Sequence, residues 1–375
     1  MTYLDHNATS PLRPEAKAAM ERALAVTGNP SSVHAAGRAA RALVEEARER
    51  LASNLSVRAQ DLVFTSGATE ANALALWGAI HGAADANARI TRLFVSAIEH
   101  ESVLQNAAAI AERQAGTRLT LIPVTPRGQI DVDALSGLLR EGKGRALIAV
   151  MAVNNETGVI QPLQDVAKLA REYGALLLVD AVQALGKIAF DGALADYVSL
   201  SSHKIGGPTG VGALWIRDGA PFSPQILGGG QERGRRAGTE NVIGIAGFGG
   251  CVVATGTTTV RDRFEGALKN VDGVVIFGND APRVSNTSCF ALEGIAAETA
   301  VMALDLDGIC VSSGSACSSG KVRPSYVLGA MGVTEELASC ALRASFGWNS
   351  VEADADVAVA AIERLVARTR ARRAA

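Results

Sequence analysis

The stretch DYVSLSSHKIGGPTGVGAL, residues 196–214, is the part of the sequence from which the fold can be predicted first. It begins as an apolar, β-branched run that predicts a strand. It then breaks at SSHK, residues 201–204, into a glycine-rich turn before a second short strand at residues 212–216. A lysine in such a frame suits a Schiff-base amine, which has to be held in a partly dry pocket. A surface lysine in a turn is the alternative interpretation.

The chain has seven lysines, and only Lys204 is flanked in the sequence by hydroxyls, an imidazole and glycines. Lys187 follows directly after a predicted strand. The others lie in helical patterns beside other charges, in a charged turn, or in a serine and glycine loop: Lys17, Lys168, Lys269, Lys143 and Lys321. We therefore expect Lys204 to be the one lysine that is held in a pocket.

Length and composition bound the class of protein. At 375 residues the chain exceeds what one hydrophobic core usually holds, so we expect a large domain and a smaller one. A hydrophobic content of 48% with 39 glycines is typical of an ordinary soluble α/β protein. The net charge of -2 gives no general attraction to nucleic acid or to an anionic membrane, so we expect neither as a partner.

The cysteines indicate a reducing compartment. They are odd in number and contain no CxxC pair: Cys251, Cys289, Cys310, Cys317 and Cys340. This pattern argues against a disulfide framework and against a structural zinc site. Because the N-terminus also has no apolar signal segment, the cytoplasm is the expected location.

Strands and helices alternate between residues 61 and 214, which predicts a mostly parallel sheet covered by helices on both faces. In such sheets, ligands bind beyond the carboxyl ends of the strands. One strand, residues 62–64, runs into SGAT and a long apolar helix, a helix start equally consistent with a phosphate site and with a plain N-cap. The residues expected to meet at this edge are Ala68, Thr69, His100, Asn155, Asp180, Gln183, Ser201, His203 and Lys204.

The chain changes character at about Cys251, where a second set of helices and strands begins. We assign residues 15–250 to a large domain, and residues 251–375 together with residues 1–14 to a smaller α/β domain. The segment GLLREGK, residues 137–143, matches the spacing of a phosphate-binding P-loop, but Gly144 replaces the required Ser or Thr. We set this match aside as a charged helix with its C-cap. The five histidines show no metal-ligand spacing.

A lysine amine, a phosphate-ready helix start and an acid at a strand end together suit pyridoxal phosphate. The aldehyde of this cofactor would condense with Lys204. Asp180 would keep the pyridine nitrogen protonated, and His100 would stack on the ring. The alternatives are that Asp180 is a strand-end cap and that His100 is an ordinary core histidine.

The sequence also offers candidate binding residues for the phosphate and the phenolic oxygen of the cofactor. Its phosphate would bind the N–H groups of Ala68 and Thr69 with help from Ser201 and His203, and its phenolic oxygen would bind Asn155 and Gln183. Arg343, in LRASFG, is the best candidate for a substrate carboxylate, because a guanidinium fork matches two oxygens. An ordinary ion pair is the alternative for Arg343.

A second special stretch is VSSGSACSSGK, residues 311–321. A cysteine among serines and glycines is typical of a hydrated loop, so Cys317 is the candidate nucleophile. Cys251 and Cys340 lie in apolar helical stretches and are expected to be inert packing residues. Cys310 lies in the apolar run DGICV and is expected to be buried.

These motifs together resemble the cysteine desulfurases of the NifS/IscS type, within the class V aminotransferase group of pyridoxal-phosphate enzymes. The resemblance covers nearly the whole chain, in family order: YLDHNAT, GNPSSVHAAGR, FTSGATEAN, EH at residues 99–100, VNNETGVIQP, VDAVQALGK, SSHKIGGPTGVGAL, GGGQERGRRAGTEN, SSGSACSSG and LRASFG. It implies the fold type I architecture of pyridoxal-phosphate-dependent transferases.

The resemblance also implies roles. Lys204 is then the Schiff-base lysine, Cys317 takes the persulfide, and His100 handles protons. Thr239 reaches the cofactor phosphate of the other subunit in a homodimer with shared active sites, and Arg343 and Asn155 bind the substrate. The implied reaction converts L-cysteine to L-alanine and passes sulfur to acceptors such as an iron–sulfur scaffold.

The sequence departs from the family pattern at three positions without losing a catalytic group. His6 stands where asparagine is usual, Thr209 where lysine is common, and Trp348 where a basic residue often follows. The acceptor stays open, as does a transient role of Cys317 as an iron–sulfur ligand shared with a scaffold. A selenocysteine lyase or C–S lyase on the same fold is the alternative function, and a non-catalytic assembly subunit is a second one.

Overall fold

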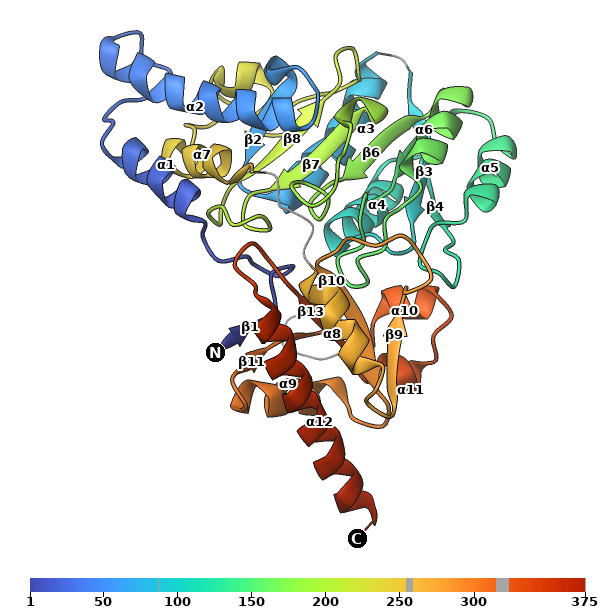
Figure 1. The fold of residues 1–375 in the computed structure, drawn as a ribbon. Helices are drawn as coiled ribbons and strands as arrows, with labels where there is room; N and C mark the ends of the chain where they lie inside the picture. The colour runs from blue at the N-terminus through green and yellow to red at the C-terminus, as the bar shows by residue number, and fades with distance from the viewer. Residues whose placement is uncertain (87, 254–258, 315–323, 375) are drawn as a thin grey trace.

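The large part of the molecule is built on a seven-stranded sheet (Figure 1). The structure is a computed structural model that describes residues 1–86, 88–253, 259–314 and 324–374. The strands follow the order β2 (Leu62–Thr65), β8 (Gly212–Ile216), β7 (Tyr197–Ser201), β6 (Leu176–Asp180), β5 (Arg145–Ala149), β3 (Ile90–Ser96) and β4 (Arg118–Ile122). Only β8 runs antiparallel to its neighbours, so the predicted mostly parallel sheet is confirmed.

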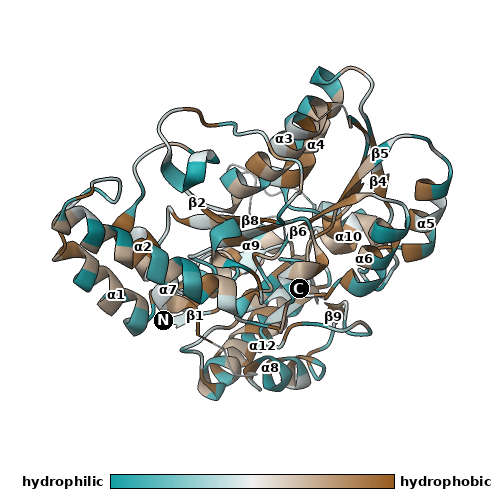
Figure 2. Ribbon diagram, turned by 90° about the horizontal axis from the view of Figure 1, so that it is seen from above, coloured by the Kyte–Doolittle hydropathy of each residue, from teal (hydrophilic) through white to brown (hydrophobic). Residues whose placement is uncertain are grey.

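Side chains of successive strand residues enter two different hydrophobic clusters, because they point to opposite faces of the sheet. Leu62 and Phe64 pack in one cluster and Val63 in the other. The first face is covered by α2 (Ala35–Asn54), α5 (Val132–Arg140), α6 (Leu163–Glu172) and α7 (Val242–Cys251). The second face is covered by α3 (Ala68–Asp85) and α4 (Glu101–Arg113). In Figure 2, strands β4 and β5 are brown, whereas α2 and α6 carry teal turns.

A second, four-stranded antiparallel sheet lies below the first in Figure 1. It has the order β12 (Ser312–Ser313), β13 (Ala341–Ser345), β10 (Thr287–Leu292) and β9 (Val274–Phe277). Helices α8 (Val260–Leu268), α9 (Ala297–Leu306) and α12 (Glu352–Ala374) share one hydrophobic cluster with it. The short helices α10 (Tyr326–Ala330) and α11 (Glu335–Ala338) share another.

The start of the chain packs with its C-terminal part. Strand β1 (Thr2–Tyr3) pairs in parallel with β11 (Ile309–Cys310), and Leu4 is buried in the same cluster as α8, α9 and α12. The next helix, α1 (Pro14–Leu24), lies instead beside α7 at the large sheet (Figure 1). Residues 10 and 13 bond to the turn after β7, through Ser10 N–H to His203 O and Arg13 N–H to Gly206 O. The division into residues 15–250 and residues 251–375 with residues 1–14 stays a proposal.

The set-aside P-loop match is the last turn of a helix. Helix α5 ends at Arg140, and Gly144 has a left-handed φ of 100° in the turn that leads to β5. A P-loop needs the opposite order, with a glycine-rich loop running into the start of a helix. The geometry of residues 137–144 therefore does not form a phosphate cradle.

His6 fixes the N-terminal segment against the end of β13. The side chain is 2% exposed, and its Nδ1 lies 2.7 Å from the hydroxyl of Ser10. A Cβ on Gly347 would fall 1.8 Å from the same nitrogen, which no packed side chain tolerates. With a histidine at position 6, the residue at position 347 therefore has to be a glycine.

We predict that Gly347→Ala lowers the free energy of unfolding by about 1–3 kcal/mol, the usual cost of overpacking. The double variant His6→Ala/Gly347→Ala should recover part of this loss, because the ring that the methyl meets is gone. Gly266→Ala, inside α8 with open space around its Cα, is the matched control and should be neutral or stabilising. Urea titration measures all three variants. A Gly347→Ala variant as stable as wild type would show that position 347 does not have to be a glycine beside His6.

Candidate active site

A cavity of about 460 Å³ opens at the carboxyl ends of the strands of the large sheet, where the N-terminal segment and β13 come close to it. It brings together residues that are scattered over the sequence. Every strand-end residue that the sequence predicted for the site lines it, together with the predicted substrate arginine: Ala68, Thr69, His100, Asn155, Asp180, Gln183, Ser201, His203, Lys204 and Arg343.

One end of the cavity is the start of α3. Strand β2 ends at Thr65, and the helix begins at Ala68 after an extended Gly67. The first N–H groups of a helix have no partner within it, and the helix dipole adds partial positive charge there, so an anion is favoured. A Cβ on Gly212 would lie 2.5 Å from the backbone of Gly67, so glycine lets β8 pass beside this turn.

An acid that sequence reasoning missed stands at the same helix start. Glu70 accepts hydrogen bonds from the N–H and the hydroxyl of Ser66, and its other oxygen binds Arg236 Nε at 2.8 Å. Burial works against the ionised form, but the bonds from Arg236 and Ser66 outweigh it, and the pKa of Glu70 is lowered. Its charge is therefore neutralised within the chain, which leaves the helix start able to take a phosphate.

Asp180 is held rigidly at the end of β6. Its Oδ1 accepts from the N–H of Val182 at 3.0 Å, and its Oδ2 accepts from Asn72 Nδ2 at 2.9 Å. Asn72 also donates to the hydroxyl of Ser102 at 3.0 Å. Sequence reasoning missed Asn72, although a lone buried amide in the apolar helix ATEANALALWGAI, four residues after Ala68 and so on the same face, was the available signal.

His100 both caps a helix and lines the cavity. It is the N-cap residue of α4, and its Nδ1 accepts the N–H of Ser102 at 3.1 Å. The hydroxyl of Ser102 lies 2.8 Å from the same nitrogen. Because Nδ1 accepts, the proton of the neutral ring is on Nε2. The two interpretations of His100 are thus compatible, since a capped helix fixes a ring at the cavity wall.

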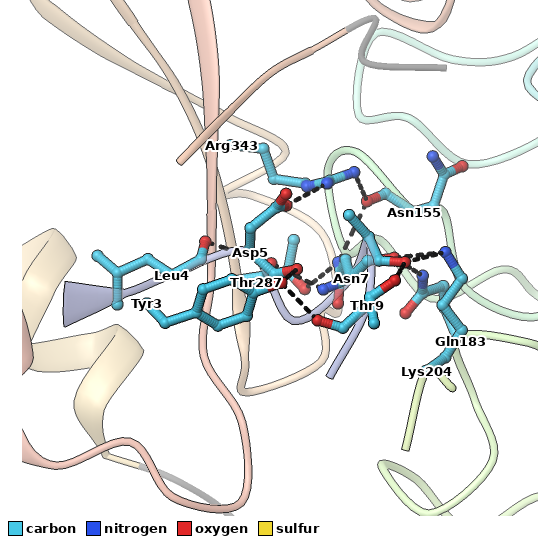
Figure 3. Close-up of polar contacts among 12 residues, drawn as sticks. Tyr3, Leu4, Asp5, Asn7, Thr9, Asn155, Gln183, Lys204, Thr287 and Arg343 are labelled. Carbon is cyan, nitrogen blue, oxygen red and sulfur yellow. Dashed lines mark hydrogen bonds and ion pairs between the residues drawn. The ribbon is translucent and has the colours of Figure 1, made fainter. Parts of the chain in front are cut away.

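Lys204 extends from the turn after β7 to the N-terminal segment. Its Nζ donates to the carbonyl oxygens of Asn7 at 2.8 Å and Ala8 at 2.9 Å. Gln183 Nε2 donates to the same Asn7 oxygen at 3.0 Å. Figure 3 shows Lys204 and Gln183 meeting this segment from one side, while Arg343 approaches it from the other.

A second lysine shares this network, although of the two only Lys204 lines the cavity. Lys187 Nζ donates to Asn7 Oδ1 at 3.0 Å and also to Gln183 Oε1. Burial lowers the pKa of Lys187 to about 7, and the positive charges of Lys204 and Arg343 act in the same direction. The sequence neighbours of Lys187 did not reveal this network, because Gln183 lies four positions before it and Asn7 comes from far away in the chain.

The neighbours of Lys204 in the sequence complete this wall. Ser201 is the buried last residue of β7, and His203 Nδ1 lies 3.1 Å from the hydroxyl of Thr9. Burial and then the charge of Lys204 lower the pKa of His203 to about 4. At neutral pH, His203 therefore offers a neutral imidazole and not a cation.

Arg343 forms the ion pair that the alternative interpretation expected, and it lines the cavity as well. Its Nη2 binds Asp5 Oδ1 at 2.7 Å, and its Nη1 donates to the backbone oxygen of Asn155 at 3.2 Å. The Nε of Arg343 and the Oδ1 of Asn155 are buried without a hydrogen-bond partner. Such groups cost free energy unless a ligand satisfies them, so both are poised for a bound molecule.

The two remaining predicted site residues are Thr239 and Cys317. Thr239 is exposed and does not line the cavity of its own chain. Cys317 lies outside the described residues. Cys310 is half-buried and not buried as expected, because it lies on the short edge strand β11; Cys251 and Cys340 are buried as expected.

Two absences hold for the described part of the chain. Within it, we find no group of three or more His, Cys, Asp or Glu side chains able to hold a metal ion. No helix there combines the length and the apolar character needed to cross a membrane.

The residues present fit pyridoxal phosphate. A helix start with its acid neutralised faces one end of the cavity, a fixed carboxylate and a lysine amine lie at its wall, and the orphaned amide oxygen of Asn155 is available to a ligand. Lys204, Asp180 and the start of α3 would hold the aldehyde, the ring nitrogen and the phosphate respectively.

Comparisons with known proteins agree with the geometry. Residues 2–357 match the family Aminotransferase class-V. A cysteine desulfurase of Cereibacter sphaeroides is 43% identical over 98% of this chain and 96% of its own, and an IscS-like cysteine desulfurase of Mycobacterium tuberculosis is 38% identical over 99% and 97%. A NifS-like protein from Rickettsia africae superposes with a TM-score of 0.86 at 32% identity, covering 97% of this chain and 99% of that one.

The fold and the site define a pyridoxal-phosphate-dependent enzyme of fold type I. More narrowly, the chain belongs to the Aminotransferase class-V family, and within it to the cysteine desulfurases. The predicted resemblance, fold class, cofactor and enzyme class are thereby confirmed.

Glu99 is a buried acid close to Asp180, and the sequence motifs predicted no role for it. It is 0% exposed; one oxygen accepts the N–H of Met151 at 2.6 Å and the other has no partner. Burial, with a smaller contribution from the charge of Asp180, raises the pKa of Glu99 well above 4.5. The folded protein therefore keeps this carboxyl protonated where the unfolded chain has lost the proton.

We predict that stability falls as pH rises from about 4.5 toward the folded-state pKa of Glu99, because only the unfolded state releases the proton there. Glu99→Gln should remove this slope, which amounts to at most ~1.4 kcal/mol per pH unit for one group. Glu49→Gln, which removes an exposed carboxyl, controls for the loss of charge itself. Urea titrations across this pH range measure the effect, and equal slopes in wild type and Glu99→Gln would show that Glu99 ionises normally.

Proposed function

We propose that this chain transfers the sulfur of L-cysteine to the thiol of its own Cys317 and releases L-alanine. In the balanced step, the Cβ–S bond of the substrate breaks, an S–S bond forms on Cys317, and the thiol proton is conserved in the alanine product. The observation that supports this proposal most strongly is the cavity that joins Lys204, Asp180, His100 and Arg343 in a chain similar to cysteine desulfurases over its full length.

Arg343 is proposed to bind the substrate carboxylate. Its side chain is 3% exposed, so an ion pair formed there is shielded from water and strong. Its unpartnered Nε offers a donor that Asp5 does not occupy. Asn155, held to the same guanidinium through its backbone oxygen, would orient the bound amino acid from the neighbouring wall.

Lys204 is proposed to move the substrate proton. Bound pyridoxal phosphate supplies an electron sink that weakens the bonds at the substrate Cα. The Nζ of Lys204 would accept the Cα proton, and the carbonyls of Asn7 and Ala8 would hold the resulting ammonium. His100, with its proton on Nε2, would donate a hydrogen bond to the bound substrate or cofactor, while Asn72 holds Asp180 in place for the ring nitrogen.

The finer parts of the function follow from the family resemblance and are part of the proposal. We expect a homodimer in which exposed Thr239 reaches the site of the other subunit, which accords with its absence from the cavity of its own chain. An iron–sulfur scaffold or another sulfur-acceptor protein would receive the sulfur. A cytoplasmic location and a transient iron–sulfur ligand role of Cys317 stay predictions from the sequence.

We predict that Cys317→Ser retains the visible absorbance of the cofactor and binds L-cysteine, because those steps need Lys204, Asp180 and Arg343. Sulfur transfer should vanish, because a hydroxyl does not replace a thiolate as the sulfur acceptor. Cys310→Ser, which removes the half-buried thiol nearby in the sequence, is the control and should transfer sulfur normally.

Mass spectrometry after brief exposure to L-cysteine should find a reductant-reversible gain of one sulfur on the Cys317 peptide. Release of sulfide from Cys317→Ser at the wild-type rate would refute the nucleophile assignment. In that case the selenocysteine lyase or C–S lyase alternative, which needs no loop cysteine, would explain the site.

A further inference from the structure

Glu156 is a buried acid beside the cavity that none of the roles above uses. It is 3% exposed and belongs to the turn after β5, where its N–H donates to Asn154 Oδ1 at 3.0 Å. It follows Asn155 directly, but it does not line the cavity. Its carboxyl contacts instead Ser325, which belongs to the C-terminal part of the chain.

The hydroxyl of Ser325 both accepts and donates a hydrogen bond. It is the N-cap residue of α10, and its Oγ accepts the N–H of Leu328 at 3.1 Å. The same hydroxyl donates its proton to Glu156 Oε2. Since a hydroxyl has a single proton, the bond to Glu156 fixes the orientation in which the oxygen caps the helix.

Gly314 also lies close to the carboxyl of Glu156. A Cβ on Gly314 would lie 3.3 Å from Glu156 Oε2 and 3.4 Å from the Cβ of Ser325. The N–H of Gly314 donates to the backbone oxygen of Ala341 at 3.1 Å, which ties it to β13, the strand that carries Arg343. Residues 314 and 325 therefore converge on Glu156, although eleven positions separate them in the sequence.

A hydrogen bond of Tyr326 is a second link between α10 and the active site. Its hydroxyl donates to the backbone oxygen of Glu99 at 2.6 Å, directly before His100 in the chain. The start of α10 is thus bonded to two segments that follow strands of the large sheet, one ahead of His100 and one behind Asn155. Both segments carry residues of the cavity wall.

We propose that Glu156 is a positioning residue for sulfur transfer, which acts by holding Ser325 next to Gly314. Gly314 precedes Cys317 by three positions and Ser325 follows it by eight, so the carboxyl fixes the described chain on both sides of that cysteine in the sequence. The inference rests on the proposed function, because it assumes that Cys317 receives the sulfur.

The charge of Glu156 is secondary to its hydrogen bond. The titratable groups that face it are Arg343 on β13 and Cys289 on β10. Burial raises the pKa of Glu156 to about 7, against the opposing effects of the Ser325 bond and of Arg343. An ionised carboxylate and a neutral carboxyl both offer an acceptor oxygen, so a glutamine amide should hold Ser325 equally well.

The test compares two pairs of variants of the full-length, cofactor-loaded protein. Ser325→Ala should slow persulfide formation in a single turnover by about 10- to 100-fold, the usual effect of a misplaced reacting group. Thr334→Ala removes the equivalent N-cap of α11 without touching Glu156, so it should lower the melting temperature to a similar extent but leave the transfer rate unchanged. Glu156→Ala should behave as Ser325→Ala, and Glu156→Gln should restore the rate.

Two further readouts separate positioning from binding. The KM for L-cysteine and the visible absorbance of the cofactor should stay at wild-type values in all four variants, and kcat should fall only in Ser325→Ala and Glu156→Ala. The double variant Glu156→Ala/Ser325→Ala should be no slower than either single variant, because the two residues act as one unit.

The inference is overturned if Ser325→Ala transfers sulfur as fast as Thr334→Ala, or if Glu156→Gln is as slow as Glu156→Ala. It is also overturned if the Glu156 variants lose cofactor or raise KM, since Glu156 would then belong to the binding site. A wild-type protein that forms no persulfide would instead refute the proposed function, so the two failures are distinguishable.

Discussion

The hydrogen bonds of Asn7 are the interaction on which the rest of the active site depends. Asn7 is 2% exposed and belongs to the N-terminal segment, whose β1 pairs with β11 and whose Ser10 bonds to the turn after β7. Its backbone and amide groups bond to residues of both parts of the chain: Lys204, Gln183, Lys187, Asn155, Asn286, Thr287 and Ser345. A single buried asparagine thus fixes Lys204 relative to the strand that carries Arg343.

This arrangement solves an electrostatic problem. Lys204, Lys187 and Arg343 bring three cationic groups close together, and buried like charges repel strongly. Carbonyl and amide oxygens of Asn7 and Gln183 accept hydrogen bonds from the two lysines, and the carboxylate of Asp5 pairs with Arg343. Burial, and after it the positive charges of Lys204 and Arg343, lower the pKa of Lys187 to about 7. A site of this kind favours anionic ligands, as the phosphate of the cofactor and the carboxylate of an amino acid both are.

The sequence predicted the sheet and most of the cavity wall because both depend on local patterns. Apolar runs alternate with helical patterns, and parallel strands place residues such as Asp180 and His100 at one edge. It did not predict Asn72, Asn7, Lys187 or the Glu70–Arg236 pair as parts of the site, since their partners come from distant segments. The half-buried state of Cys310 was missed because the strand that it pairs with is the first one of the chain.

The most direct test of this account is the identity of the lysine that binds the cofactor. Lys204 and Lys187 share one network, but only Lys204 lines the cavity. Borohydride reduction of the purified, yellow protein, followed by peptide mapping, should place the pyridoxyl group on Lys204 and leave Lys187 unmodified. A pyridoxyl group on Lys187 would contradict the account, because the network around Asn7 would then present the other amine to the cofactor.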